Sequence, residues 1–220
     1  MKVSVIIPSR GRPEQLRCCI RGLLATTRNH NVEVIAVIDQ CPESAAALQG
    51  MPVKVLSNSE HQGATACWNQ GSLVATGKVL VLGADDLVFF KGWLDAALAT
   101  LEEMGGSGMV GFNDGITPEH AFSPHHMMTR DFIARYMNGC FVIPCYKHQY
   151  VDLEATARAR RAGKYKWCEG AYVEHRHHAH GLADIDEVYR LGNSYKEADR
   201  EVFLARQAAG WPNDFDPILR

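Results

Sequence analysis

The sequence predicts an α/β fold, with a Rossmann-like, mostly parallel central sheet that is flanked by helices and followed by C-terminal helices. Segments typical of strands and helices alternate through the first 104 residues with short, turn-rich joints, as in βαβ units. The run KVLVL at residues 78–82 has no polar face, which is typical of a strand buried on both sides of a parallel sheet. A chain of 220 residues with 46% hydrophobic content can bury one good core, so we expect a single domain spanning residues 1–220.

The first half is predicted to contain four strands joined by helices. Pro8 should end the first strand, and Pro13 should open the first helix, where proline is well tolerated. Gly50 should close a short second helix. Because the four strands are parallel, their carboxyl ends meet at one edge of the sheet, where ligands bind in open α/β folds. The expected strands cover residues 2–7, 32–38, 53–56 and 78–82, and the expected helices cover residues 13–24, 44–48, 65–75 and 92–104.

The pattern changes after Gly105, but no low-complexity linker separates the two halves. We expect a short strand at residues 109–112, helices near residues 130–137 and 152–162, and two more helices in the tail. The second half is therefore interpreted as an elaboration of the same domain.

Composition argues against several classes of protein. The net charge is −2 and the sequence pI is near 6.5, so nothing global attracts the chain to nucleic acid or to an anionic membrane. The seven cysteines include no CxxC pair and lie in apolar segments, as expected of reduced core residues. No apolar stretch approaches membrane-spanning length, and residues 3–7 read as a strand rather than as part of a signal peptide. We therefore expect a soluble cytoplasmic protein.

Two adjacent carboxylates, Asp85 and Asp86, follow the apolar run 78–82 at the predicted ligand-binding edge. Two unneutralised acids placed side by side repel each other unless a cation or a cationic partner lies between them. Mg²⁺ and Mn²⁺ prefer oxygen ligands, which makes the pair a candidate metal site. The alternative is that Asp86 caps the following helix and that Asp85 is merely solvated.

Five segments, in this order, resemble the family 2 glycosyltransferases, which have the GT-A fold. The first two resemble that family's first strand with its nucleotide loop, and its second strand. The third resembles the NxxxxGxxxxRNxG block, the fourth the acidic metal-binding motif, and the fifth the acceptor-side segment followed by a strand that ends in histidine. The segments are VSVIIPSRGRPEQL (3–16), EVIAVIDQ (33–40), NSEHQGATACWNQG (58–71), GADDLVFFKGWL (83–94), and DLEATARARRAG with AYVEH (152–163 and 171–175).

The resemblance implies a GT-A fold and an enzyme that transfers a hexosyl or pentosyl group from a nucleoside-diphosphate sugar to an acceptor hydroxyl, with a UDP-sugar as the first candidate donor. Residues 1–104 would bind the nucleotide sugar, residues 105–183 would form the acceptor and catalytic side, and residues 184–220 would add helices. Asp39 would read the base. The residues expected around the nucleotide are Pro8, Ser9, Arg10, Arg12, Asp39, Asn58, Gly63, Asn69, Ala84 and Asp85.

The same resemblance makes Asp85 the direct ligand of Mn²⁺ or Mg²⁺ and Asp86 a further ligand or an acceptor beside the metal. A divalent cation would stabilise the charge that develops on the leaving diphosphate. His175 is the expected nitrogen ligand, and His177 is the second choice. Two alternatives stay open for the histidines of residues 175–180. They could be solvated loop residues, or a zinc site, which is awkward because alternate residues of an extended chain face opposite sides.

The acceptor hydroxyl must lose its proton as it attacks, which requires a general base. Asp152 is the first candidate, because it is expected to begin a helix whose positive dipole end favours the ionised carboxylate. Glu154 is the second candidate. Family membership implies inversion at the anomeric carbon. Taken alone, an aspartate at a helix start also fits a simple N-cap.

Two positions depart from the family pattern. Gly83 stands where the acidic motif usually begins with aspartate, and Trp68 stands where the third block usually has a basic residue. Arg10 and Arg12 would have to compensate for the lost positive charge. These departures motivate one alternative function, a non-catalytic module that binds nucleotide sugars. The other alternative is a nucleotidyltransferase that makes sugar nucleotides, although its triphosphate loop should be longer than residues 8–13 allow.

The motifs do not define the acceptor. Some small enzymes of similar sequence glycosylate modified bases in bacteriophage DNA, and a local basic cluster makes nucleic acid one candidate acceptor. A solvated helix surface explains the cluster equally well, and a saccharide, a lipid-linked sugar and a protein stay open. The cluster comprises Arg158, Arg160, Arg161, Lys164 and Lys166, interleaved with Tyr165 and Trp167.

Overall fold

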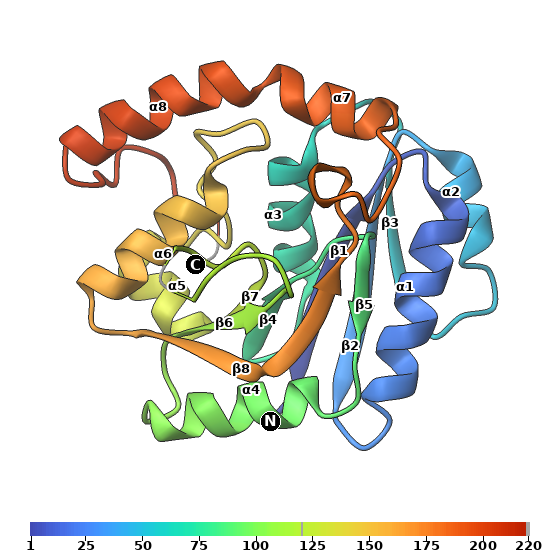
Figure 1. Ribbon diagram of the computed structural model, residues 1–220, viewed down its shortest axis with the longest axis horizontal. Coiled ribbons are helices and arrows are strands. Elements are labelled where there is room, and N and C mark those ends of the chain that lie inside the picture. Colours follow the sequence, from blue (N-terminus) through green and yellow to red (C-terminus); the bar gives the residue numbers. More distant parts are fainter. Residues whose placement is uncertain (120, 219–220) are drawn as a thin grey trace.

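The computed structural model describes residues 1–119 and 121–218. In this part of the chain, eight strands form a sheet in the order β3-β2-β1-β4-β7-β6-β8-β5 (Figure 1). The four amino-terminal strands pair in parallel, as predicted, and the remaining strands mix both directions. The parallel strands are β1 (Val3–Ser9), β2 (Val32–Asp39), β3 (Lys54–Asn58) and β4 (Val79–Leu82).

The helices of the first half begin and end within a few residues of their expected positions. Pro13 and Pro42 stand at the first positions of their helices, where the absent N–H removes no hydrogen bond. The helices are α1 (Pro13–Thr26), α2 (Pro42–Ala47), α3 (Ala64–Val74) and α4 (Trp93–Glu103).

Strand β1 does not end at Pro8, contrary to the prediction, but continues to Ser9. Its neighbour β4 pairs with it only as far as Ile6, opposite Leu82. Beyond Ile6, β1 therefore has no partner on that side, and a proline can remain in the strand without removing a ladder hydrogen bond there. The extension carries Ser9 to the edge where the acid pair begins.

Alternate residues of the parallel strands face two separate cores. On β1, Val3, Val5 and Ile7 belong to one core and Ile6 belongs to the other. Helices α1 and α4 contribute to the first core, and α3 contributes to the second together with α5 (Arg130–Tyr136) and α6 (Val151–Arg161). Helices thus cover both faces of the sheet, which explains why the run at residues 78–82 has no polar face.

The second half contains the predicted strand near residues 109–112, a longer version of the strand expected to end in histidine, and one strand that was not predicted. Strand β7 (His126–Thr129) is antiparallel to both β4 and β6 (Met109–Asn113). Strand β8 (Tyr165–His175) pairs first with β6 and then, after an irregularity, with the short strand β5 (Leu87–Phe89). Strands β5 and β7 escaped prediction because they are short and their pairing partners are distant in the sequence, and of β8 only residues 171–175 were expected, as the strand that ends in histidine.

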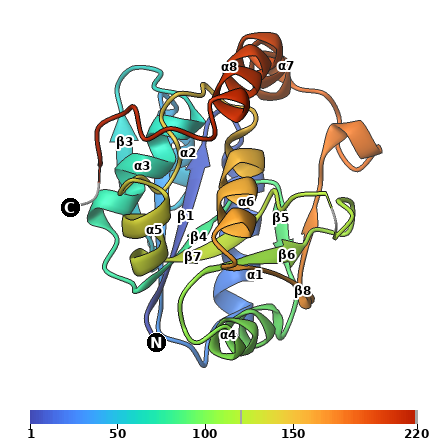
Figure 2. The ribbon, with the colours of Figure 1, turned by 90° about the vertical axis from the view of Figure 1, so that its left-hand side faces the viewer.

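The two predicted tail helices are α7 (Glu187–Ser194) and α8 (Lys196–Ala208). They run one after the other along the same side of the molecule, at the top of Figures 1 and 2. A short 3₁₀ turn, His178–His180, connects β8 to this segment. None of the helices in the described residues is long and apolar enough to cross a membrane.

Candidate active site

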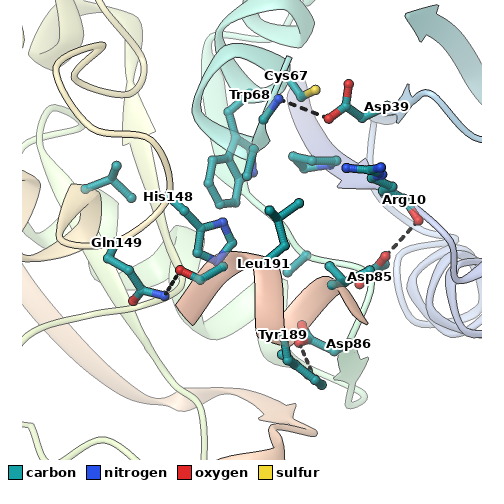
Figure 3. A pocket seen from close by; sticks show the side chains of 18 of the residues that line it. Arg10, Asp39, Cys67, Trp68, Asp85, Asp86, His148, Gln149, Tyr189 and Leu191 are labelled. Carbon is teal, nitrogen blue, oxygen red and sulfur yellow. Dashed lines mark hydrogen bonds between the residues drawn. The ribbon is translucent and has the colours of Figure 1, made fainter. Parts of the chain in front are cut away.

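A pocket opens at the carboxyl ends of β1, β2 and β4, between the start of α6 and helix α7. The parallel strands place the loops that follow them at this edge, as the sequence predicts. Figure 3 shows side chains from several of these elements converging on the pocket. The predicted site residues that line it are Pro8, Ser9, Arg10, Arg12, Asp39, Gly63, Ala84, Asp85, Asp86, Asp152, His175 and His177.

The acid pair lies at the base of this pocket and is almost fully buried, with Asp85 6% and Asp86 7% exposed. Both oxygens of Asp85 accept hydrogen bonds, one from Ser9 Oγ at 2.7 Å and one from Arg12 Nη1 at 3.1 Å. Asp86 Oδ2 accepts one from the Tyr189 hydroxyl at 3.0 Å (Figure 3). Asp86 Oδ1 has no hydrogen-bond partner among the described residues. The pair is therefore unequal, and Asp86 has the free oxygen.

Burial and the neighbouring charge of Asp86 raise the pKa of Asp85 to about 6. Burial also opposes ionisation of Asp86, but the hydrogen bond and charge of His175 outweigh it and hold the pKa of Asp86 below its usual value. Two carboxylates this close need positive charge to ionise together, and Arg12 supplies part of it, with Nη1 3.1 Å from Asp85 Oδ1 and 3.8 Å from Asp86 Oδ2. The pair is thus suited to a cation.

His175 reaches Asp86 because of strand register. Leu87, the residue after Asp86, pairs with His175 across β5 and β8. The His175 Nε2 atom lies 3.4 Å from Asp86 Oδ2, and its Nδ1 atom lies 3.9 Å from Asp114 Oδ2. Although burial favours the neutral ring, Asp86 raises the pKa of His175.

His177 also lines the pocket, but it is a poorer ligand than His175. Its Nδ1 atom accepts a hydrogen bond from the backbone N–H of Ala179 at 3.2 Å. A neutral ring then carries its proton on Nε2, so neither nitrogen is available to a metal. Burial and the charge of His175 lower the pKa of His177 to about 4, which keeps the ring neutral.

Within residues 1–119 and 121–218, no three His, Cys, Asp or Glu side chains form a preformed metal cage. The free oxygen of Asp86 and the adjacent His175 ring nevertheless match the oxygen and nitrogen donors that Mn²⁺ accepts. Such a site would be completed by oxygens of a bound diphosphate, in keeping with an ion that holds few protein ligands.

Arg12 is already neutralised within the protein. Its guanidinium binds both oxygens of Asp186, at 2.6 and 2.9 Å, in addition to Asp85, and lies 4.0 Å from the centre of the Tyr189 ring. Burial opposes the charged form, but these partners raise the pKa of Arg12. A ligand phosphate would therefore have to compete with carboxylates for Arg12. Arg10, by contrast, lines the pocket and has no ion-pair partner in the part of the chain that the structure describes.

Asp39, at the end of β2, organises the loop before α3. Its carboxylate accepts hydrogen bonds from the backbone N–H groups of Gln62, at 2.8 Å, and Gly63, at 3.0 Å. The His61 Nδ1 atom lies 2.6 Å from Asp39 Oδ2 and also faces the pocket. Because a carboxylate can only accept, His61 donates from Nδ1, and its Nε2 atom remains available to a ligand.

Asn58 and Asn69 do not line the pocket, so the structure does not support a direct nucleotide contact for them. The Asn58 amide donates to Gln70 Oε1 at 2.9 Å. The Asn69 amide exchanges hydrogen bonds with the backbone of Val142, at 2.8 and 3.0 Å. Both side chains anchor α3, and the partner of Asn69 is too distant in sequence for this role to be predicted.

Asp152 is the second residue of α6, not its N-cap, which is Tyr150. Its side chain is half-buried and faces the pocket. Burial raises the pKa of Asp152 to about 6, only partly offset by the backbone N–H of Leu153, which donates to Oδ1 at 2.9 Å. The structure thus places a carboxylate with a pKa close to neutrality in the same pocket as the acid pair.

Glu154 is not available as a base, contrary to its inclusion among the catalytic candidates. It is 0% exposed and lies outside the pocket. Its carboxylate accepts hydrogen bonds from Tyr146 at 2.5 Å, Arg158 at 2.8 Å, and Arg206 at 2.9 and 3.0 Å. These bonds outweigh burial and lower the pKa of Glu154. The residue ties α6 to α8.

Replacing Glu154 by alanine is expected to lower the free energy of unfolding by about 3–5 kcal/mol, because two buried arginines would lose their carboxylate. Urea denaturation of the variant and of an exposed control, Glu201→Ala on α8, measures this loss. A loss below about 1 kcal/mol, typical of surface ion pairs, would contradict the structural role.

Part of the predicted basic cluster is used in contacts within the chain. Arg158 is buried on Glu154 and donates to the backbone oxygens of Trp211 and Pro212, each at 3.1 Å. Arg161 donates to the Gly210 oxygen at 2.8 Å, and Lys166 pairs with Glu103. Two of these charges are thus paired with carboxylates within the chain, whereas Arg161 donates to a backbone oxygen, and the acceptor stays an open question.

The two departures from the family pattern contact each other. The Trp68 indole N–H donates to the Gly83 carbonyl at 2.8 Å. A Cβ at Gly83 would lie 2.9 Å from Ile7 Cγ1 and 3.0 Å from the Ile6 oxygen, so β1 leaves no room for a side chain there. The two departures from the family pattern, Trp68 and Gly83, are therefore part of one hydrogen-bonded arrangement at the pocket wall.

Several residues that line the pocket were not predicted from the sequence. Tyr189 lies on α7, far from the motifs, and only the fold brings it to Asp86. His61 lies inside the third block and was detectable there as a polar residue beside Gly63. His125 lies in a segment with no recognised motif. The additional pocket residues include His61, His125, His148, Tyr150, Tyr189 and Tyr195.

Comparisons with known proteins identify the fold and the family. One of the solved structures similar to this chain is that of the mannosyltransferase PcManGT from Pyrobaculum calidifontis, in complex with GDP-Man and Mn²⁺, with a TM-score of 0.72 and 13% sequence identity. The match covers 98% of this chain and 66% of that chain, and it confirms the predicted GT-A fold. Comparison with curated proteins gave no match. The family model for glycosyl transferase family 2 matches residues 4–165, and the chain belongs to this family of glycosyltransferases.

Proposed function

We propose that the chain is a metal-dependent, inverting glycosyltransferase that moves a sugar from a nucleoside-diphosphate sugar to an acceptor hydroxyl. The observation that carries the proposal is the presence, in one pocket, of the acid pair with His175 and of the half-buried Asp152. This arrangement provides separate groups for the leaving diphosphate and for the attacking hydroxyl. The solved neighbour that binds GDP-Man and Mn²⁺ supports both a divalent metal and a sugar nucleotide.

Asp86 and His175 would hold the metal, with Asp85 supporting them. This assignment reverses the order expected from the sequence, because both oxygens of Asp85 are occupied whereas Asp86 Oδ1 is free. A bound divalent cation would supply Lewis-acid stabilisation of the diphosphate charge. Arg10, which has no ion-pair partner within the described residues, would contact the same diphosphate from the β1 loop.

The nucleotide would lie along the loops after β1 and β2, beside Pro8, Ser9, Gly63 and Ala84. Asp39 would act on the base mainly through His61, because its own oxygens are used by His61 and by two backbone N–H groups. A free His61 Nε2 can accept a hydrogen bond, which suits uracil, thymine or guanine, since each carries a ring N–H. Both UDP- and GDP-sugars are therefore candidate donors.

Asp152 would accept the proton of the acceptor hydroxyl. General bases work best when their pKa lies near the working pH, and burial brings the pKa of Asp152 to about 6. Attack from the face opposite the leaving group would invert the anomeric configuration. A saccharide, a lipid-linked sugar, a protein and nucleic acid all remain candidate acceptors.

A thermal-shift screen tests the proposal. UDP-, GDP- and TDP-sugars are added with and without Mn²⁺, and one donor at about 100 times its Kd should raise the Tm by about 5–10 °C in the presence of metal. Transfer or slow hydrolysis of that donor then separates an enzyme from a binding module. Release of pyrophosphate from a nucleoside triphosphate would instead indicate a nucleotidyltransferase, and no stabilisation by any sugar nucleotide would contradict the proposal.

A further inference from the structure

His125 is buried in the pocket wall, and its ring nitrogens have no hydrogen-bond partner within the described part of the chain. It lies directly before β7, is 5% exposed and lines the pocket. Neither Nδ1 nor Nε2 has a hydrogen-bond partner among the described residues. Its backbone, by contrast, is firmly held, because its carbonyl accepts hydrogen bonds from Phe112 N at 3.0 Å and from Ser123 Oγ at 2.8 Å. The ring is therefore preorganised but unsatisfied.

An unsatisfied buried ring costs free energy in the ligand-free protein, because it has lost its hydrogen bonds to water. An apolar ring of the same shape would fill this position at lower cost. The stability of the ligand-free fold consequently does not account for a histidine at position 125, whereas a ligand that pairs with its nitrogens does.

The neighbours of His125 indicate which part of a ligand it would meet. Its ring packs edge-on against His175, with ring centres 4.6 Å apart and planes at 88°. His175 contacts Asp86 on the proposed metal side, and the proposed base Asp152 lines the same pocket. During transfer, the sugar must lie between the diphosphate and the attacking hydroxyl. A side chain that faces the pocket beside His175 is placed to contact that sugar.

The chemistry of the ring fits hydroxyl groups. The His125 ring has two nitrogens, and both lack a hydrogen-bond partner among the described residues. A neutral imidazole offers one donor and one acceptor. Adjacent sugar hydroxyls, each of which can donate and accept, complement this pair.

We propose that His125 is a specificity-determining residue that hydrogen-bonds hydroxyl groups of the transferred sugar. This inference rests on the proposed function and adds a sugar-recognition residue to it. It distinguishes His125 from the groups that bind the nucleotide and the metal. Binding of a sugar nucleotide should therefore depend on His125, and binding of the corresponding nucleoside diphosphate should not.

The test compares His125→Phe, which keeps a ring and removes both nitrogens, with His125→Gln, which restores a donor and an acceptor. His126→Phe is the matched control. His126 is equally buried and also has an unpartnered Nε2 atom within the described residues, but it does not line the pocket. Calorimetry with Mn²⁺ measures the Kd of GDP-mannose against GDP, and of UDP-glucose and UDP-N-acetylglucosamine against UDP.

His125→Phe should weaken binding of the preferred sugar nucleotide by about tenfold or more and change binding of its nucleoside diphosphate by less than about twofold. His125→Gln should recover part of the loss, and His126→Phe should bind both ligands as the wild type does. The Tm of ligand-free His125→Phe should be unchanged or higher, because the unsatisfied nitrogens are gone.

Other results would overturn the assignment. An equal loss for the sugar nucleotide and the nucleoside diphosphate would make His125 a metal ligand or a structural residue, and a lower Tm would identify the structural case. Unchanged binding of both ligands would show that His125 does not contact the sugar. If the wild type binds a nucleoside diphosphate but none of the three sugar nucleotides more tightly, the proposed function fails first, and this inference fails with it.

Discussion

Asp152→Asn should lower the rate of sugar transfer by about 10²–10⁴-fold while leaving nucleotide binding unchanged, because the variant lacks only the carboxylate that accepts the hydroxyl proton. The geometry predicts this separation, since Asp152 lines the pocket from α6, and its carboxylate is hydrogen-bonded to the backbone of Leu153. Turnover with the donor found in the screen and the Kd of its nucleoside diphosphate measure the two effects. Full activity would remove Asp152 from the mechanism.

The pH profile tests the same residue independently. A base must be ionised to act, and burial raises the pKa of Asp152 to about 6. The value of kcat/KM should therefore fall about tenfold for each pH unit below about 6. An acid limb that persists in Asp152→Asn would belong to another group.

Although Asp152→Asn should lose activity, its thermal stability at pH 8 should be higher than that of the wild type. The folded pKa of Asp152 lies above its unfolded value, so the stability that its protonated form contributes is lost as the pH rises through about 6. Asparagine does not ionise, so the variant keeps this stability at high pH and should have a higher Tm than the wild type at pH 8. A lower Tm would indicate that Asp152 mainly supports the start of α6.

Asp86→Asn should abolish the effect of Mn²⁺ on nucleotide binding. Loss of a direct ligand should weaken the metal-dependent part of the affinity by about 100-fold or more, since even residues that only orient a ligand cost 10–100-fold. Calorimetry of UDP and GDP with and without Mn²⁺ measures this difference. The near-isosteric amide keeps a partner for the Tyr189 hydroxyl, so the fold should be retained.

The matched comparison for the metal is Asp85→Asn. Because Ser9 and Arg12 occupy both oxygens of Asp85, this variant should retain most of the Mn²⁺ effect. If Asp85→Asn abolishes the effect and Asp86→Asn does not, the assignment made from the sequence, with Asp85 as the direct ligand, is the better one. If Mn²⁺ changes the Kd of UDP or GDP for neither the wild type nor the variants, the metal proposal is wrong.

The parallel half of the fold could be predicted because its signals are local. The apolar run at residues 78–82 is buried on both faces, and Pro13 begins a helix in the structure as it does in the pattern. The same applies to the acid pair, whose place follows from the end of β4. Strand β5 could not be predicted, because three residues carry little pattern and the pairing partner is more than 80 residues away.

The candidate site also has features that the sequence predicts and features that only the fold decides. Asp152 and Glu154 are two residues apart, and both looked like possible bases. Only the fold shows that Arg206, 52 residues beyond Glu154, occupies that carboxylate. The histidine-rich segment was equally ambiguous until the register of β5 and β8 placed His175, and not His177, against Asp86.

By itself, the sequence determined the α/β class, the family resemblance and the edge of the sheet at which the acid pair lies. These features depend on residue types and on short-range periodicity, which can be read along the chain. The tertiary structure decided which carboxylate is free, which arginines are neutralised and which histidines face the pocket. Those properties depend on burial and on partners distant in sequence, such as Asp186 for Arg12 and Tyr189 for Asp86, and no local pattern records them.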